Sequence, residues 1–167
     1  MAVLEILTAP DPRLKIKAEK VQDLSTIQTL INDMLETLYA TDNGIGLAST
    51  QVGYKEAVVI IDLSDNRDDP LILVNPEVVS GSNKAFGQEG CLSVPDYYAD
   101  VERFTSVVVS ALDREGNPIT IESDDFLAIV MQHEIDHLLG NLFIDYLSPL
   151  KKKMAMKKVK KYVKAHS

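Results

Sequence analysis

The chain has 167 residues, one cysteine and a formal net charge of −8. A domain of this length buries roughly two thirds of its unfolded surface and needs no disulfide framework, and none can form within a chain whose one cysteine is Cys91. No stretch approaches the roughly 20 apolar residues that span a bilayer, and the first residues lack the pattern of an export signal, so we expect a cytoplasmic protein with no membrane partner.

The first expected element is a helix over residues 25–40, because apolar side chains recur there at helical spacing. They form one stripe: Ile27, Leu30, Ile31, Met34, Leu35 and Leu38. Ser25 followed by Gln28 resembles a capping box at the start of this helix. The turn signal Asp42-Asn43-Gly44 ends it.

Short β-rich runs follow, at residues 57–63, 71–74, 77–80, 105–112 and 118–122. Their short polar spacers favour antiparallel pairing, because parallel strands need crossovers of a dozen or more residues. No repeat, low-complexity tract or linker divides the sequence. The predicted fold class is α+β, with short antiparallel or mixed sheets packed around a central buried helix, and residues 1–167 form a single domain.

That central helix is expected over residues 124–140, between the acidic pair Asp124-Asp125 and the terminating Gly140. Apolar residues wrap much of its circumference, which predicts burial. They are Phe126, Ile129, Val130, Ile135, Leu138 and Leu139. Two histidines and a glutamate lie within this apolar helix.

The segment 148–167 is strongly basic and is a third helix candidate. It holds eight lysines and no acidic residue, whereas residues 1–147 hold nine basic and 25 acidic residues, a net charge of −16. The body should therefore repel nucleic acid and the tail should attract it. Composition alone favours a solvated helix face over a binding surface. The tail's apolar residues would form a thin docking stripe: Leu150, Met154, Val159 and Val163.

The central helix carries the HExxH pattern within Gln132-His133-Glu134-Ile135-Asp136-His137. His133 and His137 are four residues apart, so they share one helix face and can bind the same metal ion. Glu134 lies close enough to act on water at that metal without being a ligand. A single histidine is usually an ordinary core or surface residue, but this combination favours a metallohydrolase site.

A catalytic site of this type takes three protein ligands and keeps one position open. Asp145 and His166 are the downstream candidates for the third ligand. Cys91, in Gln88-Glu89-Gly90-Cys91-Leu92-Ser93, is the better one, because a thiolate binds divalent transition metals strongly. Alone, Cys91 would more often be an inert buried thiol.

A third segment, residues 44–53, contains the glycine-rich run GIGLASTQVG. A dinucleotide-binding loop should follow a strand and open a helix, whereas this segment follows a helix and has Ser49 at the third glycine position. The alternative is a loop that lets substrate backbone approach, with the Gln51 amide donating to an oxyanion. Gln51 could also be an ordinary polar residue at a strand edge.

Together these segments resemble the three motifs of the peptide deformylase family: GIGLASTQ at 44–51, EGCLS at 89–93 and QHEIDH at 132–137. They stand in that family's order and at its spacing, and the similarity continues through LILVNPE and NLFIDYLSPLKK over nearly the whole chain. The resemblance implies a bacterial, iron-dependent enzyme that hydrolyses the N-formyl group of formyl-methionine on nascent polypeptides and releases formate.

The resemblance assigns one divalent metal ion to three ligands: Cys91, His133 and His137. The ion is usually Fe2+, with Ni2+, Co2+ or Zn2+ able to replace it in preparations. It would lower the pKa of its water and polarise the formyl oxygen. Glu134 would take the proton from that water and pass it to the departing amine. The Gln51 side chain and the Leu92 backbone N–H would stabilise the oxyanion.

The resemblance also implies that Gly46 binds the substrate backbone. It assigns four residues to the pocket for the methionine side chain: Ile45, Phe126, Ile129 and Val130. Because deformylases with a basic C-terminal helix dock on the ribosome, it predicts ribosome binding by residues 148–167. The sequence departs from the family at Ser49, where alanine is usual, and at Tyr98, where many relatives carry an arginine near the substrate's path.

The sequence leaves two other functions open. A metalloprotease of the wider HExxH type would not need Cys91 to bind its metal, whereas a deformylase would. A non-catalytic metal-binding or ribosome-associated relative would not need Glu134.

Overall fold

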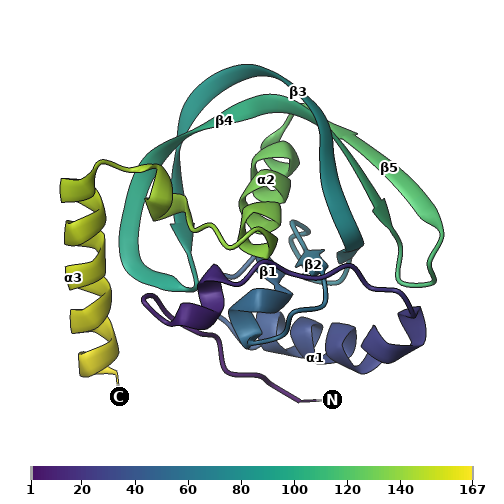
Figure 1. The fold of residues 1–167 in the computed structure, drawn as a ribbon, viewed down its shortest axis with the longest axis horizontal. Helices are drawn as coiled ribbons and strands as arrows, with labels where there is room; N and C mark the ends of the chain where they lie inside the picture. Colours follow the sequence, from purple (N-terminus) through teal and green to yellow (C-terminus); the bar gives the residue numbers. More distant parts are fainter. Residues whose placement is uncertain (1, 167) are drawn as a thin grey trace.

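The computed structural model describes residues 2–166 and has the predicted α+β architecture (Figure 1). Within these residues, one five-stranded sheet has the order β1-β2-β3-β4-β5, and all its strand pairs are antiparallel. The strands are β1 (Gly46–Ala48), β2 (Val58–Ile61), β3 (Leu71–Cys91), β4 (Val94–Leu112) and β5 (Pro118–Ser123).

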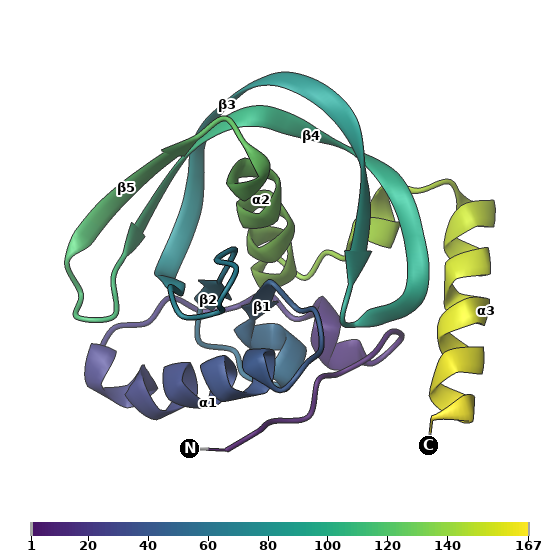
Figure 2. The ribbon, with the colours of Figure 1, turned by 180° about the vertical axis from the view of Figure 1, so that it is seen from behind.

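The α-helices of the described chain are α1 (Gln28–Tyr39), α2 (Phe126–Leu138) and α3 (Pro149–Ala165). Short 3-10 turns lie between the larger elements: Pro12–Lys15, Leu24–Ile27, Ser49–Val52 and Phe143–Tyr146. In Figures 1 and 2, β3 and β4 arch over α2, while α1 lies across the opposite side and α3 stands beside β4. Helix α2 is therefore largely enclosed, as predicted, but two residues of the predicted apolar circumference are not buried, since Phe126 and Leu139 are 57% and 50% exposed.

Strands β3 and β4 are much longer than the sequence analysis predicted. Residues 81–104 were assigned to no element, yet they complete a hairpin that continues to Cys91 and Val94. Residues 81–88 of β3 are exposed, so they carry no alternating apolar pattern to reveal a strand. The backbone ladder to β4 extends the hairpin instead, and it carries the second motif back to α2.

Helix α1 forms as predicted, but its start differs. The capping box expected at Ser25 is absent, because Ser25 lies in a 3-10 turn and donates its backbone N–H to the Asp23 carboxylate. The predicted stripe is buried except at Leu35, which is half-buried, and it packs against β1 and β2.

Helix α2 is capped by Asp125, whose carboxylate accepts the Leu127 N–H at 3.1 Å. It ends before Gly140, which has a φ of 83° that favours glycine. Ala128, Met131 and Ile135 on α2 are buried against the sheet. The helix that carries the histidines is thus fixed at both ends and along its length.

Helix α3 forms within the predicted tail, but the predicted docking stripe is wrong at most of its positions. Leu150 and Met154 are 69% and 54% exposed, and Val163 is 39% exposed. Only Val159 of the stripe is buried, together with Ala155, because the small alanine side chain lets the helix approach the body closely. Among residues 2–166, no helix is both long and apolar enough to cross a membrane.

Candidate active site

Three metal-binding side chains converge at α2. His133 and His137 lie one turn apart on this helix, and their Nε2 atoms are 3.3 Å from each other. Cys91, the last residue of β3, places its Sγ 3.3 Å from Nε2 of His137. The donor atoms of all three residues lie within 4.8 Å of one another.

This donor set fits a divalent transition metal. Tetrahedral bonds of about 2.0–2.3 Å to nitrogen and sulfur set neighbouring ligand atoms about 3.4–3.6 Å apart, close to both 3.3 Å separations. Burial and the neighbouring His133 lower the pKa of His137 well below its ordinary value, which keeps that imidazole in the neutral form that binds metals. The three residues therefore form a candidate metal site.

The other candidate ligands lie elsewhere. Asp145 pairs with Lys15 and Lys152 at 2.6 and 2.7 Å and anchors α3 to the body. His166 stacks on Tyr162 near the end of α3. Neither belongs to the cluster on α2.

A buried ion-pair network that sequence reasoning missed holds His133 in place. The Glu89 carboxylate lies 2.9 Å from Nδ1 of His133, leaving Nε2 to face the cluster. Arg103 donates two hydrogen bonds to Glu89, at 2.7 and 2.9 Å, and a third to Asp136. Burial alone would raise the pKa of Glu89, but the bonds from Arg103 and His133 outweigh it and lower that pKa.

Glu89 stands two residues before Cys91, yet nothing in its spacing indicates a histidine partner, and Arg103 lies in the unassigned part of β4. Carboxylates that orient ligating histidines are a common feature of metal sites. Here the network joins β3, β4 and α2 and fixes the ring of His133.

Glu134 is buried beside the cluster with a free acceptor. Its Oε1 has no hydrogen-bond partner among the described residues. Burial raises the pKa of Glu134 to about 7. Gly46 of β1 packs directly against the carboxylate, because a Cβ built at this glycine would come within 2.5 Å of Oε2. A carboxyl group in this environment is suited to accept and return a proton near neutral pH.

The segment expected to be a glycine-rich loop contains strand β1, and Gln51 is buried in the 3-10 turn that follows it rather than at a strand edge. Its Oε1 accepts the Ala48 N–H at 3.0 Å, which fixes the orientation of the amide. Its Nε2 donates to Ser93 Oγ at 3.0 Å and lies 3.5 Å from Cys91 Sγ. The amide donor thus points at the cluster.

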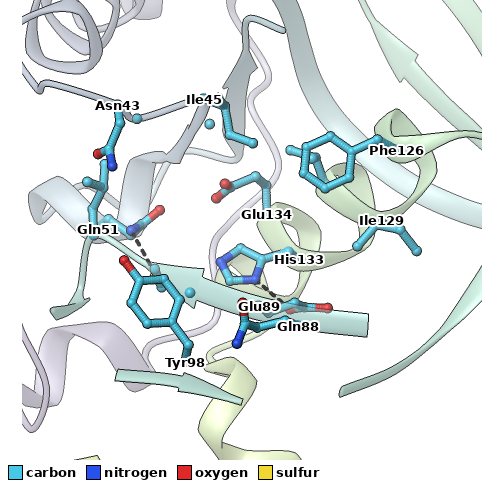
Figure 3. A pocket seen from close by; sticks show the side chains of 16 residues that line it. Asn43, Ile45, Gln51, Gln88, Glu89, Tyr98, Phe126, Ile129, His133 and Glu134 are labelled. Carbon is cyan, nitrogen blue, oxygen red and sulfur yellow. Dashed lines mark hydrogen bonds and ion pairs between the residues drawn. The ribbon is translucent and has the colours of Figure 1, made fainter. Parts of the chain in front are cut away.

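These groups border a cavity of about 260 Å³. All the predicted catalytic and substrate-binding residues line it: Ile45, Gly46, Gln51, Leu92, Phe126, Ile129, Val130 and Glu134. Figure 3 shows Phe126 and Ile129 on one side of the cavity and Gln51 and Tyr98 on the other. Between them, the His133 ring lies between the carboxylates of Glu134 and Glu89.

The two departures from the family pattern have different surroundings. Ser49 does not line the cavity, and its buried hydroxyl donates to the Glu56 carbonyl at 2.5 Å. Tyr98 lines the mouth and is 63% exposed, with its ring packed on the backbone of Gly90. Ser49 is therefore remote from the chemistry, whereas Tyr98 can meet a bound substrate.

An α+β fold that gathers a cysteine sulfur and two imidazoles around one point, with the buried carboxyl group of Glu134 beside them, has the features of a metal-dependent hydrolase. Comparisons with known proteins narrow this class to one family. The sequence model of the family described as "Polypeptide deformylase" matches residues 3–153. The chain belongs to this family.

Individual relatives and solved structures support the same family assignment. "Peptide deformylase 2" of Vibrio parahaemolyticus is 87% identical over 167 residues, which are all of this chain and 99% of that protein. A crystal structure of a peptide deformylase from Legionella pneumophila is 43% identical, covers 99% of this chain and 98% of its own, and has a TM-score of 0.94. The enzyme from Ehrlichia chaffeensis, solved in complex with actinonin, is 39% identical, with coverages of 97% and 98% and a TM-score of 0.91.

Proposed function

We propose that the protein removes the N-formyl group from the N-terminal formyl-methionine of nascent polypeptides and releases formate. Membership of the deformylase family carries this function. The convergence of Cys91, His133 and His137 on one point, with Glu134 beside it, supplies the chemical groups that amide hydrolysis requires.

The ligands would be Cys91, His133 and His137, and the ion is proposed to be Fe2+, with Ni2+, Co2+ or Zn2+ able to take its place. Such an ion supplies Lewis acidity, which activates water and polarises the formyl oxygen. A thiolate-bound ferrous centre should lose activity in air, whereas a nickel or zinc form should not. Oxygen-insensitive activity in freshly purified, iron-containing enzyme would contradict this assignment.

Glu134 is proposed to move the proton. The Oε1 atom of Glu134 has no hydrogen-bond partner among residues 2–166, and burial raises the pKa of this carboxyl group to about 7. It can therefore take a proton from the attacking water and pass it to the departing amine nitrogen.

Two donors are proposed to stabilise the oxyanion, the Gln51 amide and the Leu92 backbone N–H. Gln51 is held by Ala48 on its acceptor side, so its amide is positioned before the substrate binds. Donors positioned in advance stabilise charge that develops in the transition state, and losing one typically costs about 10²- to 10³-fold in rate.

Substrate binding is proposed at the free edge of β1. The Ile45 carbonyl accepts the Asp62 N–H at 2.8 Å, so Ile45 faces β2. Since backbone groups alternate along an antiparallel strand, the N–H and C=O of Gly46 face away from β2 and can pair with substrate backbone. The methionine side chain would then enter the apolar part of the cavity, lined by Ile45, Phe126, Ile129 and Val130.

Anaerobic purification with metal analysis, followed by formate detection on a formyl-Met-Ala-Ser peptide, tests the function. Formate release by the metal-loaded enzyme is expected, and Cys91→Ala should lose both metal and activity. Mass spectrometry of the products separates deformylation from cleavage of internal peptide bonds. The family match favours deformylation over the metalloprotease alternative. Release of peptide fragments without formate would reverse that preference.

We further propose a cytoplasmic enzyme whose residues 1–167 form one domain, with 148–167 as a basic helix that binds the ribosome. Exposed lysines on α3 could pair with RNA phosphates, and such binding should weaken steeply with salt. Deleting the residues after Leu150 would remove these lysines, but it would also uncover apolar surface, because Ala155 and Val159 of α3 are buried. Replacing exposed Lys157 and Lys161 with glutamate is the cleaner test. This variant should hydrolyse small peptides like the parent but cosediment less with ribosomes. Unchanged cosedimentation would exclude a role of α3 in ribosome binding.

A further inference from the structure

The loop between β2 and β3, residues 62–70, is held in one shape although it lies outside the cavity. The buried Asp62 carboxylate accepts the backbone N–H groups of Ser64 and Asp69 at 2.9 and 3.2 Å and the Tyr39 hydroxyl at 2.5 Å. Arg67, in the middle of the loop, has a φ of 55°, a left-handed conformation that non-glycine residues seldom adopt. The loop therefore directs the Arg67 side chain along a defined path.

The Arg67 guanidinium gathers carbonyl groups at the end of α1 and in the turn that follows. Nη1 donates to the Thr41 carbonyl at 2.8 Å, and Nη2 donates to the carbonyls of Leu38 and Gly44 at 2.8 and 3.1 Å. The last carbonyls of a helix lack intrahelical partners and carry partial negative charge, which a cation stabilises. The guanidinium also lies 5.5 Å from the centre of the Tyr39 ring.

This turn leads directly into the wall of the cavity. Gly44 and Ile45 line the cavity, and the next residue, Gly46, packs on Glu134. The 62–70 loop holds two successive peptide groups here, because Arg67 binds the Gly44 carbonyl and the Asp62 N–H binds the Ile45 carbonyl at 2.8 Å. A loop outside the cavity thus fixes the backbone that leads to its substrate-binding edge.

We propose that Arg67 is a positioning residue of the active site, which holds the segment 41–46 so that Ile45 and Gly46 meet the substrate. The proposal rests on the deformylase function given above. Within residues 2–166, the Arg67 side chain hydrogen-bonds only to the segment 38–44 and packs on Tyr39, away from the metal ligands and Glu134. Its loss should therefore weaken substrate binding more than it slows the chemical step.

The test is steady-state kinetics on formyl-Met-Ala-Ser with Arg67→Ala. We expect KM to rise about 10-fold, the loss that one weakened backbone hydrogen bond would cause, with kcat within about twofold of the parent. Bound metal per chain should not change. Arg67→Lys, which keeps the charge but cannot bind three carbonyls with a planar fork, should show an intermediate KM.

Arg114→Ala is the matched control. Arg114 also donates two hydrogen bonds to α1, to Gln28 and Asn32 at 3.1 and 3.0 Å, but at the end remote from the cavity. Its removal should leave KM unchanged, and the unfolding temperatures of both variants report the general cost of losing an arginine. An unchanged KM in Arg67→Ala overturns the proposal, and so does an equal KM rise in Arg114→Ala.

Loss of metal or a fall in kcat alone would also overturn the proposal, because these would show damage to the catalytic centre itself. If Arg67→Ala fails to fold, the Arg67→Lys variant becomes the test of the proposal. A KM equal to the parent's in Arg67→Lys would show that the guanidinium's bonds to three carbonyls are not needed for substrate binding. Inactivity of the metal-loaded parent enzyme would instead be a failure of the proposed function and would be apparent before any variant is compared.

Discussion

Gly46 lies so close to Glu134 that adding one methyl group at position 46 should displace the carboxylate proposed to transfer the proton. A Cβ at this position would stand 2.5 Å from Oε2 of Glu134, 3.1 Å from its Cδ and 3.2 Å from its Cγ. Gly46 is not among the residues with positive φ, so its backbone can accept alanine without strain. The effect of Gly46→Ala therefore comes from contact alone.

The size of the effect follows from the overlap. Carbon and oxygen in contact lie about 3.3 Å apart, so the carboxylate must retreat by roughly 0.8 Å, and a displacement near 1 Å can cost about 10²-fold in rate. We expect kcat/KM for formyl-Met-Ala-Ser to fall about 10- to 100-fold, with the metal content unchanged, because the three atoms nearest to the added Cβ all belong to Glu134 and not to a candidate ligand.

Gly87→Ala serves as the control for this prediction. Gly87 lies on β3 outside the cavity, and a Cβ there would meet nothing within 4 Å. Its activity should match the parent's. Parental kcat/KM in Gly46→Ala, or an equal loss in Gly87→Ala, would refute the reasoning that links this contact to the position of the carboxylate.

Three further outcomes are expected. Glu134→Ala should keep the metal but lose at least about 100-fold in turnover, which metal analysis and formate release would show together; near-normal turnover would make the mechanism wrong. Glu89→Gln keeps its volume but removes the charge shared with His133, so metal affinity should fall about 10-fold in a chelator competition; equal affinity would show that the charge is unimportant. Burial would raise the pKa of Asp145, but the hydrogen bonds from Lys15 and Lys152 outweigh it and lower that pKa. The two ion pairs therefore stabilise the folded protein at neutral pH, and this stabilisation is lost as the Asp145 carboxylate becomes protonated. Asp145→Asn should therefore lose less stability than the parent between about pH 6 and pH 3 in urea unfolding, and parallel losses would exclude the contribution.

The elements that the sequence predicted are those with a strong local pattern. Helix α2 has caps at both ends and apolar residues around it, and the stripe of α1 is continuous, so both were predicted. The exposed half of β3 and the docking face of α3 were not. An exposed strand shows no alternation, and Ala155 gives no hydrophobic signal of its own although it is buried.

For the candidate site, the sequence by itself determined which groups were available for chemistry. The four-residue spacing of His133 and His137 puts both imidazoles on one helix face whatever surrounds the helix. Glu134 follows from the same local geometry. These relations are local, because helical periodicity alone fixes them.

The sequence motifs already named Cys91 and Gly46 as members of the site, but only the tertiary structure decided how these distant groups meet the helix and that Glu89 and Arg103 join them. Cys91 meets His137 because a long hairpin returns to α2. Glu89 binds His133 directly while Arg103 holds the Glu89 carboxylate, and Gly46 of β1 packs against Glu134 of α2. Each contact joins residues far apart in the chain, and its geometry depends on how sheet and helix pack. Side-chain spacing along one helix is a property of the sequence, whereas convergence between elements is a property of the folded core.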